Sequence, residues 1–215
     1  MHLAPDFAPV LTGRSVVELE ASAHTVMGLR PDYSVGYRNS AWSRFAADND
    51  APELAKWNGR PITTVFAGAV VDYYTELFRR VQESGRPEDH DYECSSPTTF
   101  RSFRLRVVPL PERALLLLHH LRVERPHDVE ASSPADFRYR DHRGVITQCC
   151  HCRRTRRATH SATWDWVPAY LDRSLPDVSH GLCPPCFRHY HPRAASSFDS
   201  QGRSTIPGLD RSPAS

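Results

Sequence analysis

The chain lacks a long apolar run. The longest, Ala114–Leu118, has five residues, far short of the roughly 18 that a membrane-spanning helix needs. The N-terminus, Met1-His-Leu-Ala-Pro-Asp6, has neither the basic region nor the apolar core of a secretory signal peptide. We therefore expect a soluble, cytoplasmic protein without a membrane partner.

The chain also lacks an excess of charge of either sign. Its 215 residues carry 27 Lys and Arg against 25 Asp and Glu, so no overall field draws the chain to nucleic acid or to a membrane surface. Lysine is almost absent, because Lys56 is the only one. Positive charge is therefore nearly all arginine, and it is most concentrated between Arg153 and Arg157.

The signatures of common enzyme classes are missing as well. The sequence has no glycine-rich phosphate loop and no nucleophile elbow. It also has no protein-kinase signature and no open metal site of the His/His/carboxylate type. These absences predict a protein that is not an enzyme.

Cysteine is scarce outside one stretch. Five of the six cysteines lie between residues 149 and 186, which is typical of a metal site in a reducing compartment rather than of a secreted disulfide framework. Two Cys-x-x-Cys pairs occur there, Cys149/Cys152 and Cys183/Cys186. Since each tight turn can point both thiolates the same way, the two pairs can hold one tetrahedral Zn²⁺ in a closed, structural site. The alternative is redox-active or idle thiols, with either pair cycling as a disulfide.

The residues around the two pairs follow the order of a known module. Basic residues follow the first pair, and Ser-His-Gly stands before the second. This order resembles a small zinc module at the C-terminus of many bacterial PAS-containing and response-regulator-like signalling proteins. The resemblance covers residues 145–192 and implies a four-cysteine module of zinc-ribbon or treble-clef-like fold. The matching positions are Cys149, Cys152, Trp164, Tyr170, His180, Gly181, Cys183, Pro184 and Cys186.

Other polar residues accompany these cysteines. Cys150 and His151 lie inside the first pair, and His180 stands three residues before Cys183. They are spare ligands, or residues that support the ligands through hydrogen bonds. The arginine cluster is either a solvated surface or a contact to an anion or nucleic acid. That cluster consists of Arg153, Arg154, Arg156 and Arg157.

Hydrophobic periodicity over the first 126 residues predicts an α+β domain. A strand hairpin around residues 24–37 precedes a helix that starts near Asn39. A long amphipathic helix is expected over residues 62–84, ended by Gly85. Three strands follow. The last of them, Ala114–Val123, is almost continuously apolar and should be central in the sheet.

This order of elements resembles the PAS fold, a five-stranded antiparallel sheet with helices on one face. The segments Leu29–Trp42 and Tyr92–Phe103 look like PAS domains of bacterial sensor proteins, and the resemblance covers residues 18–126. The expected organisation has five parts. They are a flexible leader (1–14), a PAS domain (15–126), a linker (127–144), the four-cysteine zinc module (145–192) and a disordered tail (193–215).

Aromatic residues of the long helix are interpreted first as packed core, and a PAS ligand pocket is the alternative. The resemblance argues against haem, because haem PAS domains usually ligate through a histidine on the long helix, and residues 62–84 contain none. It argues against a photoactive flavin, because no cysteine lies between Ser40 and Glu93. Cys94 is expected to be a small buried residue. The candidate pocket residues are Phe66, Tyr73, Tyr74 and Phe78.

Together the two resemblances imply a non-enzymatic sensory or adaptor protein of bacterial signal transduction. Its partner would be another signalling protein, or a second copy bound through the PAS domain. Two other functions stay open. One is a transcriptional regulator whose zinc module binds nucleic acid through its arginines, and the other is a thiol redox switch.

Overall fold

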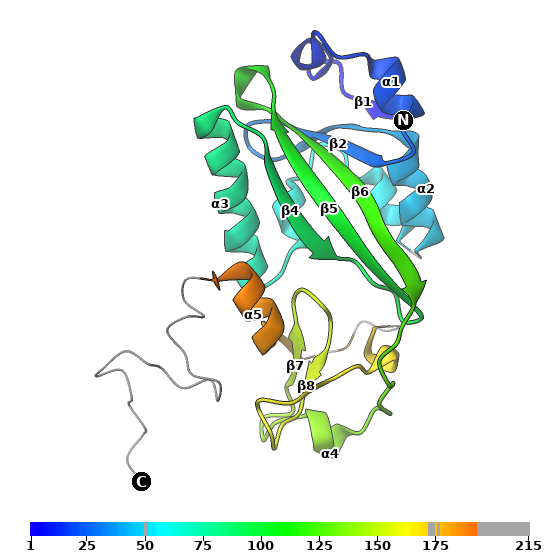
Figure 1. Ribbon diagram of the computed structural model, residues 1–215, viewed down its shortest axis with the longest axis vertical. Coiled ribbons are helices and arrows are strands. Elements are labelled where there is room, and N and C mark those ends of the chain that lie inside the picture. The colour runs from blue at the N-terminus through cyan, green and yellow to red at the C-terminus, as the bar shows by residue number, and fades with distance from the viewer. Residues whose placement is uncertain (50, 172–174, 176, 193–215) are drawn as a thin grey trace, which may run out of the picture. The chain divides into compact units, whose positions relative to one another are not determined.

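A computed structural model describes residues 1–49, 51–171, 175 and 177–192. The chain divides into two compact units, Met1–Val129 and Glu130–Ser215 (Figure 1). The expected disordered tail, residues 193–215, lies outside the described residues. Within the described part, no helix has the length and apolar character that crossing a membrane would require.

The first unit is built on one antiparallel sheet with the strand order β1-β3-β2-β6-β5-β4. The last strand, β6, lies between β2 and β5, as its continuous apolar character predicts. The five strands without β1 form the PAS fold, and β1 extends the sheet at one edge. The strands are β1 (His2–Leu3), β2 (Thr25–Leu29), β3 (Val35–Arg38), β4 (Glu88–Glu93), β5 (Thr99–Pro109) and β6 (Leu115–Pro126).

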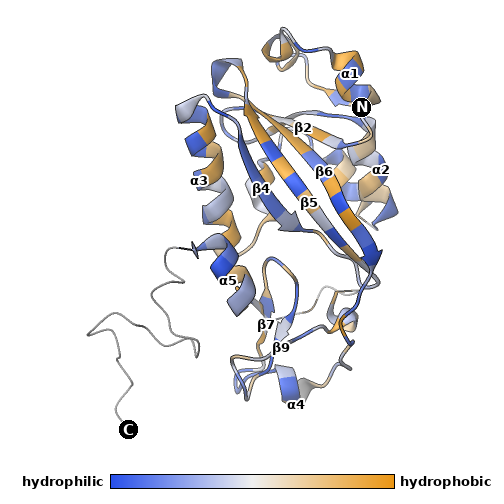
Figure 2. Ribbon diagram, viewed as in Figure 1, coloured by the Kyte–Doolittle hydropathy of each residue, from blue (hydrophilic) through white to orange (hydrophobic). Residues whose placement is uncertain are grey.

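The main helices α2 (Ser40–Asp48) and α3 (Ala69–Ser84) cover one face of this sheet (Figure 1). Phe45 of α2 meets Phe103 of β5 edge to face, with ring centroids 5.6 Å apart. Tyr74 of α3 contacts His90 of β4. His90 is paired with Leu105, which lies two residues from Phe103 along β5, so His90 and Phe103 point to the same face of the sheet. On α3, apolar residues alternate with polar ones along the ribbon, which matches a helix with one buried side (Figure 2).

Asn39 connects the helical layer to the sheet. Its Oδ1 accepts hydrogen bonds from the Trp42 N–H, which caps α2, and from the Val26 N–H of β2. Its Nδ2 donates to the carbonyl oxygens of Leu19 and His24. All hydrogen-bonding capacity of this fully buried amide is therefore used. The predicted helix start at this residue is confirmed.

The long helix begins later than its apolar pattern predicts. Residues Ile62–Val65 form a short 3-10 turn, η3, and Phe66 is extended. Gly68 has φ 58° and ψ −144°, a conformation that favours glycine and that no helical residue adopts. The helix therefore starts at Ala69 rather than at Ile62. Its end is as expected, because Gly85 adopts the left-handed conformation with φ 62°.

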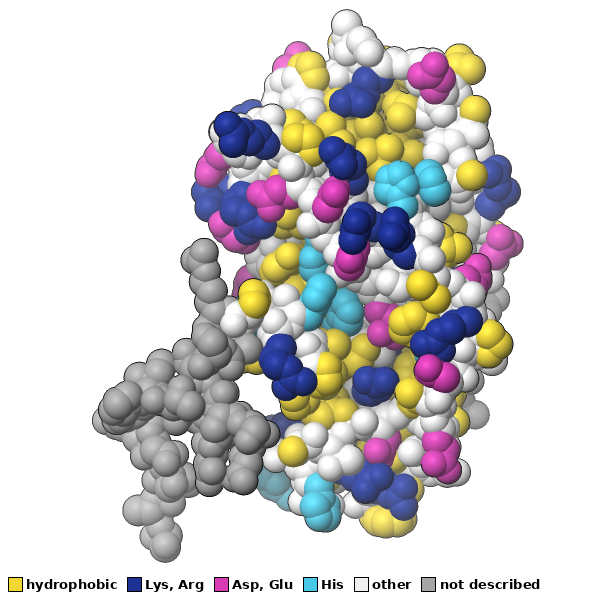
Figure 3. Space-filling model, viewed as in Figure 1, with side chains coloured by type: hydrophobic (Ala, Val, Ile, Leu, Met, Phe, Trp, Pro, Cys, Tyr) yellow, Lys and Arg dark blue, Asp and Glu magenta, His cyan; other side chains and the backbone are white. Residues whose placement is uncertain are grey.

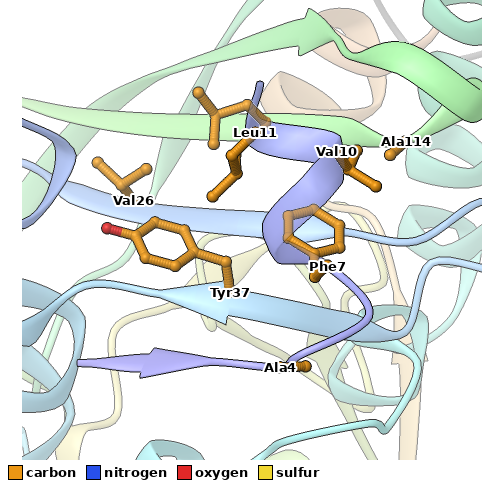
Figure 4. Packing of buried hydrophobic residues seen from close by; sticks show 8 residues of the cluster. Ala4, Phe7, Val10, Leu11, Val26, Tyr37 and Ala114 are labelled. Carbon is orange, nitrogen blue, oxygen red and sulfur yellow. The ribbon is translucent and has the colours of Figure 1, made fainter. Parts of the chain in front are cut away.

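The expected flexible leader is wrong for the N-terminal residues. Phe7, Val10 and Leu11 are buried against the sheet face opposite the helices (Figure 4). The Phe7 ring lies over Gly28 and Gly36, where an added Cβ would stand 2.4 Å from the ring. Pro5, Pro9 and Gly13 suggested disorder, yet these residues shape the tight turns around the 3-10 helix η1 (Ala8–Leu11).

Further contacts hold this N-terminal segment in place. The Ala4 N–H donates to the Gly36 carbonyl at 2.9 Å. Asp6 accepts two hydrogen bonds from the Arg30 guanidinium, at 2.7 and 2.9 Å. Hydrogen bonding to Arg30 also lowers the pKa of the Asp6 carboxyl. The segment therefore belongs to the core of the unit.

The rest of that face carries charge. Arg104 of β5 binds Asp91 of β4 through two hydrogen bonds of 2.8 Å, and Arg106 lies 3.5 Å from Asp89. Figure 3 shows basic and acidic side chains side by side over β4 and β5. These exposed cross-strand pairs contribute little stability each, but they keep the face polar.

The second unit has a four-stranded sheet with the order β10-β7-β8-β9 and a short C-terminal helix, α5 (Pro184–Tyr190). The linker expected at 127–144 is too long. Its second half forms α4 (Asp136–Tyr139), and Tyr139 is only 1% exposed among Ile146, Val167 and Tyr170. The strands are β7 (Ile146–Cys149), β8 (Thr155–Arg156), β9 (Trp164–Asp165) and β10 (Val178–Gly181).

The buried Phe7 ring yields a stability prediction. Replacing Phe7 by Ala should lower the free energy of unfolding of the first unit by about 3–5 kcal/mol, because a fully buried ring leaves a cavity between two glycines that cannot fill it. The measurement is urea denaturation of the full chain. Val17→Ala is the control, since Val17 is exposed and should matter little. A Phe7→Ala effect within the range of that control would contradict the packing described here.

Candidate metal centre

The first cysteine pair stands at the turn between β7 and β8. The Cys149 N–H donates to the Arg154 carbonyl at 2.8 Å, and the Arg153 N–H donates back to the Cys149 carbonyl at 3.0 Å. Arg153 has φ 63°, in the left-handed region, which lets the chain reverse directly after Cys152. The turn therefore points both cysteine side chains in the same direction.

The second pair stands at the start of α5. Cys183 is the N-cap, and Pro184 and Pro185 occupy the first helical positions, where a proline loses no helical hydrogen bond. The Phe187 N–H donates to the Cys183 carbonyl at 2.8 Å and closes the first turn. Cys183 and Cys186 thus lie on the same side of one helical turn.

Strand pairing brings the two pairs together. β10 runs parallel to β7, and Gly181 is paired with Cys149. The Cys150 N–H also donates to the Gly181 carbonyl at 2.8 Å. Because Gly181 is two residues before Cys183, this register sets the second pair beside the first.

The four sulfur atoms all lie within 4.8 Å of one another. The residues are between 0 and 7% exposed. The Cys152 and Cys183 sulfurs are 3.6 Å apart, whereas a disulfide bond is about 2.05 Å long. Four sulfurs around Zn²⁺ at about 2.3 Å would be about 3.8 Å apart at the corners of a tetrahedron. The spacing therefore fits a shared metal ion. The four are Cys149, Cys152, Cys183 and Cys186.

The local electrostatics favour a thiolate at Cys149. Hydrogen bonds from Cys152, then from Cys183 and Cys186, hold the pKa of the Cys149 thiol far below its usual value. The Cys183 N–H also points at the Cys149 sulfur, at 3.4 Å. Several thiolates buried together need a compensating cation, and an all-sulfur tetrahedral set is typical of zinc or of iron–sulfur sites. The residues present therefore fit a metal ion of this class.

The other predicted ligands lie outside this group of four. His151 is half-buried, and its Nδ1 lies 2.5 Å from the Tyr190 hydroxyl. Cys150 is half-buried and bonds to Gly181 through its backbone, and His180 is exposed on β10. In the structure, His151 connects the first turn to α5, which is a supporting contact.

The structure does not assemble the arginine cluster into one surface. Arg157 forms a two-fold ion pair with Asp165, at 2.7 and 3.1 Å. Arg156 donates to the Thr147 hydroxyl at 3.1 Å. Two of the four arginines therefore brace β7, β8 and β9, while Arg153 is exposed and Arg154 half-buried.

The predicted PAS pocket residues form packed core in this structure. Phe66 stacks on Tyr74 at 4.4 Å between centroids, and Tyr74 contacts Phe78 at 6.0 Å. The Tyr73 hydroxyl lies 2.9 Å from His90 Nδ1. None of the four lines the cavity of about 280 Å³ in the first unit, which lies instead beside α2. No local pattern signalled that cavity, because its lining comes from four separate stretches of sequence.

Comparison with known proteins gives only distant likenesses. No protein-family model and no curated protein matches the chain. Similar solved structures include a domain of an HTR-like protein from Haloarcula marismortui ATCC 43049, with 13% identity and a TM-score of 0.37, covering 47% of this chain and all of that one. Another is the photoactive yellow protein domain of the sensor histidine kinase Ppr from Rhodospirillum centenum, with 15% identity and a TM-score of 0.36, covering 53% and 97%.

A third similar structure is the PAS domain of an HTR-like protein from Haloarcula marismortui, with 19% identity and a TM-score of 0.32. The match covers 48% of this chain and 90% of that one. At these TM-scores the similar structures carry no argument about the fold. The PAS fold is identified by the strand order of the first unit.

Proposed function

We propose that this protein is a non-enzymatic signalling protein of the cytoplasm. Its PAS unit receives a signal or docks a partner, and its second unit folds around one structural Zn²⁺. The observation that carries the proposal is the closed group of four buried cysteines in the second unit, in a chain whose first unit has the PAS fold. Reduced thiolate sites belong to reducing compartments.

The donor set supports a structural role for the metal. A catalytic zinc keeps one position open for water or substrate, whereas four thiolates close the coordination sphere. Cys149, Cys152, Cys183 and Cys186 would hold the ion, and a bound Zn²⁺ would neutralise their buried charge. Zinc in such a site supplies folding free energy to a unit with a small core of its own.

The docking role is supported by what the units offer. The outer face of the PAS sheet carries exposed ion pairs between β4 and β5, a surface suited to contact with another protein or a second copy. Nucleic acid is the weaker candidate, because Arg156 and Arg157 are bound within the unit. A redox switch is also weaker, because a shared ion protects all four thiolates from oxidation.

Zinc content tests the ligand set. The reduced full chain should carry one Zn²⁺, and Cys149→Ser should lose most of it, because a neutral hydroxyl replaces one of the four thiolate ligands. Cys150→Ser is the matched control and should keep its zinc. Metal analysis with native mass spectrometry reports both. Loss of zinc from the control alone would show that the ligands are wrongly assigned.

Metal removal tests how folding depends on the ion. A chelator should abolish amide-exchange protection across residues 145–192, since a unit of this size has too little core to fold without the metal. Protection of α3 in the first unit should stay unchanged. Hydrogen exchange read peptide by peptide makes the measurement. Simultaneous loss of protection in α3 would mean that the two units fold as one.

A partner experiment tests the function itself. The purified full chain is titrated with duplex DNA at rising salt, and proteins bound to the tagged chain in its own cells are identified. We expect a signalling protein as partner and no DNA binding with steep salt dependence. Tight DNA binding that Arg153→Gln and Arg154→Gln weaken, and that Arg86→Gln in the first unit leaves unchanged, would overturn the proposal.

A further inference from the structure

The cavity of the first unit lies between α2 and the sheet, and we refer to it as the α2 pocket. Its volume of about 280 Å³ is slightly below the roughly 300–1,000 Å³ of pockets for drug-sized ligands. Phe45 of α2 and Phe103 of β5 pack edge to face and together form an aromatic wall of the pocket. The pocket therefore suits a small molecule with a flat apolar part. Five polar residues also line the pocket: Arg44, Asp48, Arg101, His119 and Glu124.

Arg101 is held in a fixed position at this pocket. Its side chain is 14% exposed, its Nε donates to Glu124 at 2.9 Å, and its Nη1 donates to Asn49 Oδ1 at 2.8 Å. The guanidinium lies 5.9 Å from the Phe45 ring centroid. Among the described residues, Nη2 has no hydrogen-bond acceptor. A preorganised guanidinium with donors to spare is a ready site for a carboxylate.

His119 supplies a second polar group with unused capacity. Its Nδ1 lies 2.8 Å from the Tyr92 hydroxyl, and its buried Nε2 has no partner among the described residues. If the hydroxyl donates to Nδ1, only the Nε2–H stays unpaired. The opposite tautomer leaves two groups unpaired, the hydroxyl hydrogen and the Nε2 lone pair. The first tautomer has the lower free energy, because each buried polar group without a hydrogen-bond partner is unfavourable. Burial, with a smaller effect of His120, lowers the pKa of His119 to about 4, so at neutral pH the ring is an uncharged donor.

The rim of the pocket adds one charge of each sign. Arg44 and Asp48 are both exposed on α2, one helical turn apart, and neither has an ion-pair partner among the described residues. Arg44 and Arg101 Nη2 are donors that a ligand in the pocket can reach, whereas the buried Nε2 of His119 is not exposed to it. The carboxylates of Asp48 and Glu124 balance the two arginines in charge. Arg101 is only 14% exposed and is fixed by two hydrogen bonds, whereas Glu124 is 47% exposed and Asp48 is exposed, so the fixed charge of the pocket favours a ligand with an anionic head.

We propose that the α2 pocket binds a small monocarboxylate with a flat apolar body. The carboxylate would lie at Arg101 and Arg44, and the apolar body against the aromatic wall that Phe45 and Phe103 form. Asp48 stands where it could accept an ammonium group, so the same chemistry comes from a simple carboxylic acid or from an apolar α-amino acid. The inference deepens the sensory role proposed above and rests on it for its biological meaning, by naming the class of signal.

Calorimetric titration of the zinc-loaded full chain tests this inference with three probes. Phenylacetate should bind, and the isosteric neutral phenylacetamide should bind at least about tenfold more weakly, because it loses the charge-assisted hydrogen bonds. Phenylalanine identifies the source. Tighter binding than phenylacetate assigns the pocket to amino acids, and weaker binding assigns it to simple carboxylic acids.

Two variants locate the bound probe. Arg101→Gln should weaken phenylacetate about tenfold or more, and the exposed Arg44→Gln several-fold, since each removes a charged donor. Arg86→Gln, exposed beyond the end of α3, is the control and should change nothing. Thermal unfolding checks each variant, and Arg44→Gln keeps the test valid if Arg101→Gln fails to fold.

Three results would overturn the inference. They are absence of phenylacetate binding up to about 10 mM, equal affinity for phenylacetate and phenylacetamide, or an equal loss of affinity in Arg44→Gln and Arg86→Gln. Zinc content and partner recovery are measured independently of these titrations. An empty α2 pocket with normal zinc and a recovered partner would reject this inference and leave the proposed function standing.

Discussion

Four cysteine sulfurs must share one small, dry volume, and the second unit is arranged to make that happen. The parallel pairing of β10 with β7 aligns Gly181 with Cys149, and the turn after Cys149 and the first turn of α5 each orient one pair. Without a cation, thiolates this close repel one another and lose their hydration. The small apolar cluster around Tyr139 and Ile146 is the other stabilising element. Metal binding and folding are therefore coupled in this unit.

The first unit follows a different principle, since its stability comes from apolar burial on both faces of one sheet. The helices cover one face, and the segment around Phe7 covers part of the other. Gly28 and Gly36 are essential to the packing of Phe7 on the sheet, because any side chain there would occupy the place of the Phe7 ring. A single aromatic side chain thus needs two glycines from neighbouring strands, which explains why this close packing has no simple sequence signature.

Periodic and spaced patterns predict which elements form and which cysteines converge, but they do not predict every helix boundary or the contacts between distant stretches. The apolar run of β6 predicted its central place, and the spacing of the two cysteine pairs predicted their convergence. The prolines near the N-terminus predict disorder, whereas in the structure the apolar residues between them pack on the sheet. The start of α3 was missed because its apolar period continues upstream through Gly68.

The sequence does not point to the α2 pocket, for a related reason. Aromatic residues on one helix are easy to see in a sequence, but in the structure Phe66, Tyr74 and Phe78 fill space against one another. The observed pocket combines Phe45, Arg101 and His119 from three separate parts of the chain. Cys94 was expected to be buried and is exposed, because it stands just after the last residue of β4. Only tertiary structure reveals such placements.

The central position of β6 also has a consequence for synthesis on the ribosome. β2 leaves the exit tunnel early, yet its register partner on one side is β6, with Thr25 opposite His119. Until that late strand emerges, Val26 and Met27 have one edge unpaired, and the nascent hairpin exposes apolar surface. Closure of this sheet is therefore a late, long-range event, and elongation speed through residues 88–126 sets how long the apolar surface of β2 stays uncovered.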